Sequence, residues 1–181
     1  MEDAQILDKF ADKRTRDEAF ALLLKKYQQK IYWHVRRLVI DHDDADDLVQ
    51  DIFIKVWKNL ENFREDAQLY TWLYRIATNE CITFLNRKKQ RKNVSLDDEN
   101  SAYLADSLTD TSYFNGTKAQ LKLQQALLTL PEKQRLVFNM KYFDDLKYEE
   151  ISTIVGTSVG ALKASYHLAV KKIAHFFEAN D

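Results

Sequence analysis

The chain has 181 residues, 45% of them hydrophobic and 12% aromatic, which is enough for one packed domain or two small ones. Glycine occurs three times and proline once, which argues against a β-fold because β-turns need more of both. The net charge of −1 argues against a general nucleic-acid coat protein, and no apolar run is long enough to span a bilayer. We therefore expect an all-α protein that is not inserted in a membrane.

The first ten residues, MEDAQILDKF, are acidic and lack an apolar core, so we expect no secretory signal. They fit a short helix over residues 3–14 with Ile6, Leu7 and Phe10 on its apolar side. Cys81 is the only cysteine, which excludes an intramolecular disulfide and suits a reducing compartment. These features favour a cytoplasmic location.

A longer helix is predicted after Thr15, because Thr15-Arg-Asp-Glu18 matches a capping box. Its apolar residues recur at helical spacing and should form a buried stripe: Phe20, Leu23, Leu24, Tyr27, Ile31, Val35 and Leu38. The acidic run 41–44 should end this helix, and Asp43 or Asp44 can cap the next one.

The next helix should reach about Leu60 and has two contrasting faces. The stripe expected to be buried is Ala45, Leu48, Ile52, Phe53, Val56 and Leu60. The opposite face carries Asp46, Asp47, Gln50, Asp51, Ile54 and Lys58. An isoleucine among acids and an amide indicates a docking face, with a solvated acidic face as the open alternative. A metal site is less favoured, because helical spacing spreads these aspartates along a rod.

After a loop over 61–69, a further helix is predicted to about Lys89. It begins with the aromatic stretch LYTWLY and leads into a basic run over 86–92. Rings that stack on bases, beside cations that follow phosphates, are typical of single-stranded DNA binding. The alternative is that Trp72 and Leu73 are core residues and the basic run is a solvated helix end. We expect both to hold in part, with Trp72 buried rather than in contact with a base.

Residues 94–115 lose helical periodicity and are rich in Ser, Asp, Thr and Asn, which predicts a flexible linker. Thr117-Lys-Ala-Gln120 is a second capping box and begins a helix that carries Leu121, Leu127, Leu128 and Leu130. Pro131 suits the first position of another helix. That helix should end at Asp144-Asp145 and bury Leu136, Val137, Met140 and Phe143.

The stretch 148–173 predicts a helix-turn-helix. Gly156 suits the left-handed end of the first helix, and Ser158 suits the N-cap of the second. The second helix should bury Val159, Leu162, Tyr166, Ala169, Val170 and Ile173, and its opposite face carries Lys163, Ala164, His167, Leu168, Lys171 and Lys172. In this motif the second helix enters the DNA major groove. The alternative is an αα-hairpin with a solvated lysine face.

Three blocks in this order resemble bacterial RNA polymerase sigma factors of the compact extracytoplasmic-function group. The block 44–57, DADDLVQDIFIKVW, is similar to the helix that docks on the clamp helices of the polymerase β′ subunit. The block 71–79, TWLYRIATN, resembles the region that reads and opens the minus-ten element. The block 130–135, LPEKQR, together with the helix-turn-helix, is similar to the domain that reads the minus-thirty-five element.

The resemblance implies three sets of site residues. The residues expected to dock on polymerase are Asp46, Asp47, Gln50, Asp51 and Ile54. Those expected to contact minus-ten DNA are Phe63, Tyr70, Trp72, Arg75, Asn79, Arg87 and Lys88. Those expected to contact minus-thirty-five DNA are Ser158, Lys163, Ala164, His167, Lys171 and Lys172. The chain departs from the family at Ala164-Ser165, where a serine and an arginine are common, so the contact of that arginine does not carry over.

The resemblance also implies an organisation: a region 2 domain over 1–92, an acidic and polar linker over 93–116, and a region 4 domain over 117–181. The expected partners are core RNA polymerase, through its β′ clamp helices and β flap, promoter DNA and an anti-sigma factor. We expect no cofactor, no metal and no catalytic centre in this chain. A free-standing helix-turn-helix regulator is the alternative function, although it needs a dimerisation surface and no heptad seam is evident. A metal-dependent nuclease would need converging carboxylates.

Overall fold

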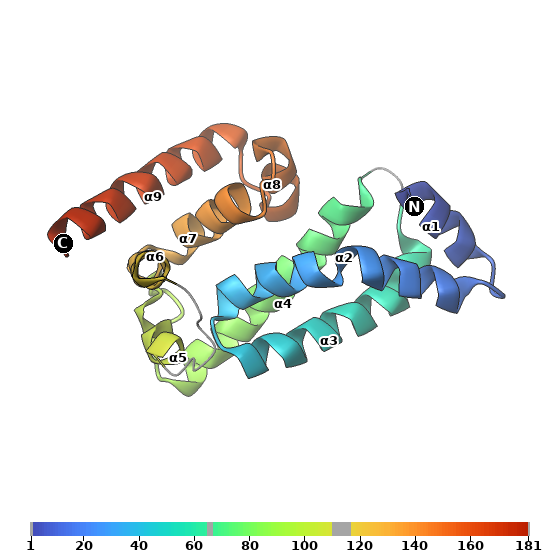
Figure 1. The fold of residues 1–181 in the computed structure, drawn as a ribbon, viewed down its shortest axis with the longest axis horizontal. Coiled ribbons are helices and arrows are strands. Elements are labelled where there is room, and N and C mark those ends of the chain that lie inside the picture. Colours follow the sequence, from blue (N-terminus) through green and yellow to red (C-terminus); the bar gives the residue numbers. More distant parts are fainter. Residues whose placement is uncertain (1, 65–66, 110–116, 181) are drawn as a thin grey trace.

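The computed structural model describes residues 2–64, 67–109 and 117–180, and within these ranges the regular elements are helical (Figure 1). The α-helices are α1 (Asp3–Ala11), α2 (Arg16–Val39), α3 (His42–Asn59), α4 (Leu69–Arg91), α5 (Ala105–Thr109), α6 (Lys118–Leu128), α7 (Glu132–Phe138), α8 (Tyr148–Val155) and α9 (Val159–Ala179). Short 3-10 turns cover Leu60–Asn62 and Ala102–Leu104, and a π-helical turn covers Asn139–Phe143. The predicted all-α class is confirmed. Residues 65–66 of the predicted loop and 110–116 of the predicted linker lie outside the described residues.

Helices α1 to α4 form one bundle, in which α2, α3 and α4 pack along their lengths and α1 closes one end (Figure 1). The predicted stripe of α3 is buried at every position, and the stripe of α2 is buried or half-buried throughout. Trp57 of α3 closes the end of the bundle, where it meets Phe10 of α1 and Phe20 of α2 edge to face at 5.4 and 5.0 Å between ring centroids. The apolar periodicity of the sequence therefore orients the helices correctly.

Two predicted helix caps are wrong. The hydroxyl of Thr15 donates to the carbonyl of Lys9 at 2.7 Å instead of accepting from its own helix, because the tight turn after α1 brings that carbonyl within reach. The cap of α3 is Asp41 rather than Asp43 or Asp44; its carboxylate accepts from the Asp44 amide at 2.9 Å, so the helix begins two or three residues earlier than expected. The capping box at Thr117 is confirmed, with both of its hydrogen bonds to Gln120 present.

Helices α6 to α9 form the second group, with α8 and α9 as the predicted helix-turn-helix (Figure 1). Phe138 stacks between Tyr142 and Tyr166 at 5.2 and 5.7 Å, and Ala169 of α9 is buried in the same small core. Val170 was expected on the buried face of α9 but is exposed. The helix is rotated so that Leu162, Tyr166 and Ala169 face inward, and Val170, one residue further, turns about 100° away from that line.

The turn between α8 and α9 depends on Gly156, whose φ is +74° and whose amide donates to Ser152 at 2.9 Å. A side chain is strained in this conformation, so Gly156→Ala should lower the free energy of unfolding by about 1–2 kcal/mol. Gly160 lies inside α9 with open space where a Cβ would point. Gly160→Ala should therefore raise the free energy of unfolding by about 0.5 kcal/mol. Urea unfolding of both variants tests this, and equal effects would contradict the assigned turn.

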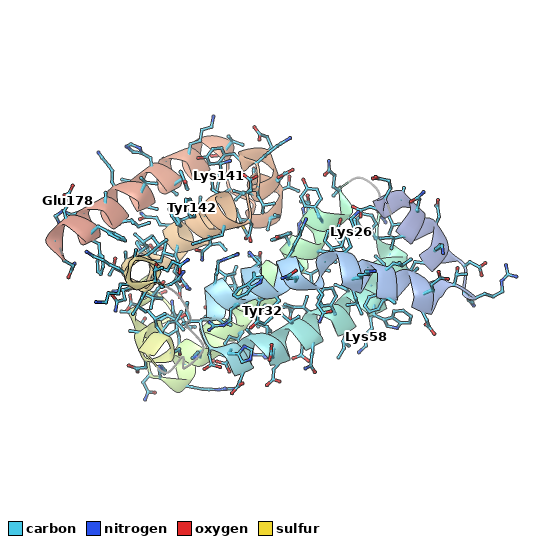
Figure 2. All side chains as sticks on the ribbon, viewed as in Figure 1. Lys26, Tyr32, Lys58, Lys141, Tyr142 and Glu178 are labelled. Atoms are coloured by element: carbon cyan, nitrogen blue, oxygen red, sulfur yellow. The ribbon has the colours of Figure 1, made fainter. Side chains whose placement is uncertain are left out.

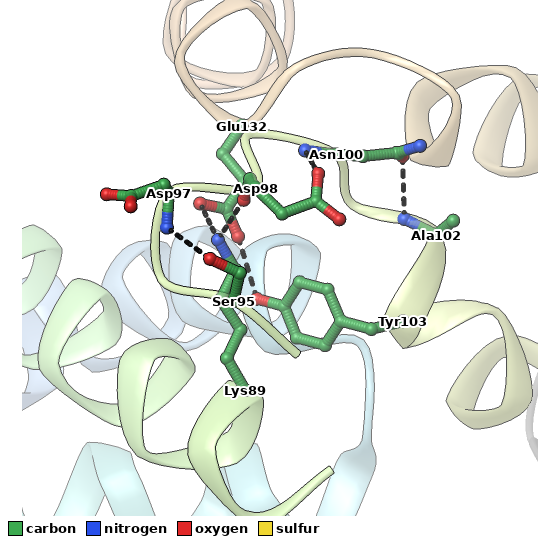
Figure 3. Close-up of polar contacts among 8 residues, drawn as sticks. All are labelled: Lys89, Ser95, Asp97, Asp98, Asn100, Ala102, Tyr103 and Glu132. Atoms are coloured by element: carbon green, nitrogen blue, oxygen red, sulfur yellow. Dashed lines mark hydrogen bonds and ion pairs between the residues drawn. The ribbon is translucent and has the colours of Figure 1, made fainter. Parts of the chain in front are cut away.

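Part of the predicted linker is folded against both groups of helices (Figure 3). The ammonium of Lys89 is 1% exposed and donates to the Asp98 carbonyl at 2.5 Å and to the Glu132 carboxylate at 2.9 Å. The hydroxyl of Tyr103 donates to the same carboxylate at 2.8 Å. Leu104 is fully buried nearby. A buried cation with satisfied partners holds residues 98–104 between the end of α4 and the start of α7, so this stretch is not the flexible chain that its composition predicts.

The two groups of helices share one buried apolar cluster. Met140, Ile151 and Ile154 of the second group belong to the same cluster as the stripes of α2 and α4. Helix α8 packs directly on α4 (Figure 1). The fold therefore places the first helix of the helix-turn-helix against the helix that carries most of the predicted minus-ten residues.

Candidate polymerase and promoter DNA interfaces

The outer face of α3 is fully open to solvent. All five residues expected to dock on polymerase are exposed, and Ile54 is 53% exposed: Asp46, Asp47, Gln50, Asp51 and Ile54. They form one continuous surface because α3 buries only its opposite stripe. The chain thus presents one exposed apolar side chain among three carboxylates and an amide on this face.

A groove of about 500 Å³ between α2 and α3 extends this face, and its lining includes Asp46, Gln50, Tyr32 and Trp33. Trp33 is a largely exposed aromatic that we did not single out from the sequence. The signal was present, because Trp33 falls between Ile31 and Val35 and therefore off the buried stripe of α2. An exposed tryptophan beside Gln50 enlarges the docking surface to two helices.

The structure brings together part of the predicted minus-ten set. Phe63 packs edge to face on Trp72 with ring centroids 5.3 Å apart, and both rings are half-buried. Arg75 and Asn79 are exposed one turn apart on α4. As the sequence suggested, Trp72 is a packing residue as much as a surface one.

Two of the minus-ten residues are engaged by α8. The hydroxyl of Tyr70 donates to the carboxylate of Glu150, and the guanidinium of Arg75 donates to the carbonyl of Thr153 at 2.9 Å. Burial, followed by the hydrogen bond to Glu150, raises the pKa of Tyr70, which therefore remains a neutral donor at physiological pH. In this arrangement the hydroxyl of Tyr70 and one amino group of Arg75 are occupied by α8, although the Arg75 side chain remains exposed.

The basic run at the end of α4 is only partly available. Arg87 is exposed, whereas the ammonium of Lys88 pairs with the Asp44 carboxylate at 2.9 Å and lies 3.3 Å from the hydroxyl of Ser107. Lys89 is buried in the linker contacts. A phosphate at this site would meet Arg87 directly and would have to displace Asp44 to reach Lys88.

The outer face of α9 presents the predicted minus-thirty-five residues. These are all exposed: Ser158, Lys163, Ala164, His167, Lys171 and Lys172. The hydroxyl of Ser158 accepts from the Ala161 amide at 3.3 Å and caps the helix, which leaves it at the start of the exposed face. Lys172 donates to the side chain of Gln134 at 3.1 Å. Tyr142, in the adjoining π-helical turn, is also exposed (Figure 2).

In residues 2–64, 67–109 and 117–180 no group of three or more His, Cys, Asp and Glu side chains is arranged to hold a metal ion. Cys81 is buried, and burial raises the pKa of its thiol, which makes it a poor nucleophile. None of the helices described in these ranges has both the length and the apolar character needed to cross a membrane.

Family models match both halves of the chain. The model for sigma-70 region 2 matches residues 23–91, and the model for sigma-70 region 4 matches residues 120–173. The first match contains α3 and α4, and the second contains the helix-turn-helix.

Several curated proteins are similar over most of their length. The RNA polymerase sigma-H factor of Pseudomonas aeruginosa is 33% identical over 172 residues, which is 90% of this chain and 87% of that protein. The ECF RNA polymerase sigma factor SigW of Bacillus subtilis is 32% identical over 86% of this chain and 87% of that protein. The ECF RNA polymerase sigma-E factor of Escherichia coli is 32% identical over 81% of this chain and 80% of that protein.

Two solved structures share the fold. The sigma factor RpoE of Bartonella quintana, solved in complex with the anti-sigma factor NepR, matches with a TM-score of 0.71 and 20% identity over 90% of this chain and 98% of that chain. CnrH, solved in complex with the cytosolic domain of CnrY, matches with a TM-score of 0.68 and 22% identity over 98% of this chain and 96% of that chain.

Proposed function

This chain belongs to the extracytoplasmic-function group of the sigma-70 family, and we propose that it docks on core RNA polymerase through α3 and reads promoter DNA through α4 and α9. In this role it directs promoter-specific initiation of transcription. One observation carries the residue assignment: the acid-and-isoleucine face of α3 and the basic face of α9 are both exposed, each in the half that the corresponding family model matches.

The proposed organisation is a region 2 domain over 1–92, a linker over 93–116 and a region 4 domain over 117–181. Both family matches fall inside the proposed domains. The proposed partners are the β′ clamp helices for the face of α3 and the β flap for region 4. An anti-sigma factor is a further proposed partner, since the sigma factor RpoE of Bartonella quintana, which shares this fold, was solved in complex with the anti-sigma factor NepR. We place the protein in the cytoplasm, where polymerase and promoter are found.

The energetics of strand opening require the polymerase. Unstacking duplex DNA costs about 1.4 kcal/mol per base-pair step, and a flipped base stacked on an aromatic ring regains about 1–3 kcal/mol. The half-buried pair Phe63 and Trp72, with Tyr70, offers few rings for this purpose. Opening several base pairs therefore depends on polymerase contacts. We assign no catalytic group to this chain, since the polymerase holds the active site for phosphodiester bond formation.

The proposal is tested by run-off transcription with core polymerase and genomic DNA fragments, with and without the chain. We expect discrete transcripts that appear only when the chain is added. A chain that shifts DNA alone, fails to bind core polymerase and adds no transcript would instead support a free-standing helix-turn-helix regulator.

The exposed face of α9 should divide recognition between its two ends. Lys163 and His167 lie one turn apart near the start of the helix, where base edges are reached, and Lys171 lies farther along, where phosphates are met. Lys163→Ala should cost about 1–3 kcal/mol at one promoter position and relax the preference there. Lys171→Ala should weaken all promoters alike and reduce the slope of log affinity against log salt by about 0.9.

A panel of upstream-element variants, transcribed at two or more salt concentrations, separates these effects. His167→Ala provides the neighbouring comparison on the same face. If Lys171→Ala changes which sequence is preferred while Lys163→Ala does not, the two ends of α9 have been assigned in the wrong order.

A further inference from the structure

The two domains are held in a closed arrangement, defined by the packing of α8 on α4 (Figure 1). Its contacts engage Tyr70 and Arg75, two residues that we assign to minus-ten DNA. The polymerase-docking face of α3, by contrast, is exposed. The closed arrangement therefore leaves polymerase docking available, while α8 occupies hydrogen-bonding groups of two residues that we assign to DNA.

A buried polar cluster adds to this closure. The carboxylate of Asp144, after the π-helical turn, is almost fully buried and reaches two side chains of α2. It lies 2.8 Å from the Nδ1 of His34 and 2.9 Å from the Nη1 of Arg37. The other ring nitrogen of His34 lies 3.0 Å from the hydroxyl of Thr78. Both carboxylate oxygens thus have a partner across the domain boundary, so this cluster favours the closed arrangement.

The burial of Arg135, on α7, disfavours the closed arrangement. Its side chain is 2% exposed, and its Nη1 donates to the carbonyls of Leu38 at 3.0 Å and Arg37 at 3.3 Å. Its Nε has no hydrogen-bond partner among the described residues, and none of their carboxylates forms an ion pair with it. The carboxylate of Glu132 already accepts hydrogen bonds from Lys89 and Tyr103 (Figure 3).

The guanidinium is therefore buried at the end of α2 with incomplete compensation. The carbonyls at a helix C-terminus carry partial negative charge and offset part of the cost of desolvation. The rest of the desolvation cost is not offset, and burial lowers the pKa of Arg135. When the domains separate, the charge returns to water, so desolvation of Arg135 opposes closure.

We propose that Arg135 keeps the closed arrangement reversible, so that polymerase can dock on α3 first and the domains can then separate to release Tyr70 and Arg75 from their hydrogen bonds to α8. The reversibility follows from the balance between the Asp144 cluster and the apolar contacts on one side and the buried guanidinium on the other. The consequence for promoter reading rests on the proposed function; the effect of Arg135 on domain separation does not.

An apolar replacement of Arg135 is physically feasible. The side chain borders a cavity of about 180 Å³ whose other walls include Leu38, Leu85 and Leu136. Methionine is unbranched, similar in length and able to fill such a space. Exchange of a poorly compensated buried charge for an apolar side chain is often neutral or stabilising. Arg135→Met should therefore shift the equilibrium toward the closed arrangement.

The experiment measures the distance between spin labels placed at Lys30→Cys on α2 and Glu149→Cys on α8 in the full chain. Both positions are exposed, and Cys81 is buried away from the labelling reagent. A urea series below the unfolding transition reveals the midpoint of domain opening even if the starting chain is fully closed. Circular dichroism on the same samples verifies that the helices remain folded.

We expect Arg135→Met to raise the closed-to-open ratio about tenfold and to move the opening midpoint to higher urea. Lys133→Met is the matched control, because Lys133 is exposed on the same helix, and it should leave the midpoint unchanged. Asp144→Asn should move the midpoint to lower urea by weakening the contacts to His34 and Arg37.

An Arg135→Met midpoint equal to or below that of the unsubstituted chain overturns the proposal, as does an equal rise with Lys133→Met. Neither polymerase nor DNA enters the measurement. A failure here would therefore leave the run-off transcription result standing, and a failed transcription assay would leave the measured effect of Arg135 intact.

Discussion

Replacement of Leu73 by alanine should lower the free energy of unfolding by about 2–5 kcal/mol, a large share of the 5–15 kcal/mol typical of a domain. Leu73 is 1% exposed, and it lies on α4, which packs against α2, α3 and α8. Truncation removes buried methyl groups from the core and leaves a cavity, and both the lost burial and the cavity lower the free energy of unfolding. Urea unfolding followed by circular dichroism measures the loss.

The matched control is Ile82→Ala on the same helix. Ile82 is 44% exposed, so its truncation should change the free energy of unfolding by only about 0.5 kcal/mol. Both variants remove branched aliphatic side chains from α4 and differ mainly in burial. Similar losses for the two would mean that α4 does not face the core as described.

The faces of α3 show what the sequence can predict. Six apolar residues at helical spacing specified the buried stripe, to which the structure adds Val49, and the polar residues with Ile54 specified the exposed face. This works because α3 lies on the outside of the bundle, where only one stripe is covered. The 3.6-residue apolar periodicity does not say which residue caps a helix. Both caps were therefore missed: the Thr15 hydroxyl donates to the Lys9 carbonyl of the preceding helix, and Asp41 rather than Asp43 or Asp44 caps α3.

The buried polar residues show what the sequence could not predict. Lys89 and Arg135 belong to residue types normally found at the surface and His34 to a type of intermediate burial, and all three are buried here. Their partners lie 43, 97 and 110 residues away, at Glu132, Leu38 and Asp144. A local sequence pattern cannot predict which residues pair when they lie so far apart in the chain. The Lys89 contact also orders part of the linker, and separate long-range contacts to Glu150 and Thr153 engage Tyr70 and Arg75. The candidate minus-ten site was therefore predicted by residue type, but its contacts with α8 were not.

Asp47→Lys should reduce the affinity for core polymerase by at least about tenfold. Asp47 is exposed in the middle of the acidic face of α3, and a charge reversal there places a cation where the resemblance implies a carboxylate contact. Like charges brought together at an interface cost several kcal/mol, and each 1.4 kcal/mol corresponds to about tenfold in affinity. The position lies beyond the first turn of α3 and off the buried stripe, so the fold should be unaffected.

Titration of labelled chain with core polymerase at two salt concentrations measures this loss. Glu178→Lys is the control for net charge, because Glu178 is exposed near the far end of α9 and outside the docking face (Figure 2). Gln50→Ala tests the neutral part of the same face and should cost about 0.5–1.5 kcal/mol with little salt dependence. The Asp47→Lys defect should shrink at high salt, because exposed charges are screened. If Asp47→Lys binds as the unsubstituted chain does while Glu178→Lys does not, polymerase docks elsewhere than on α3.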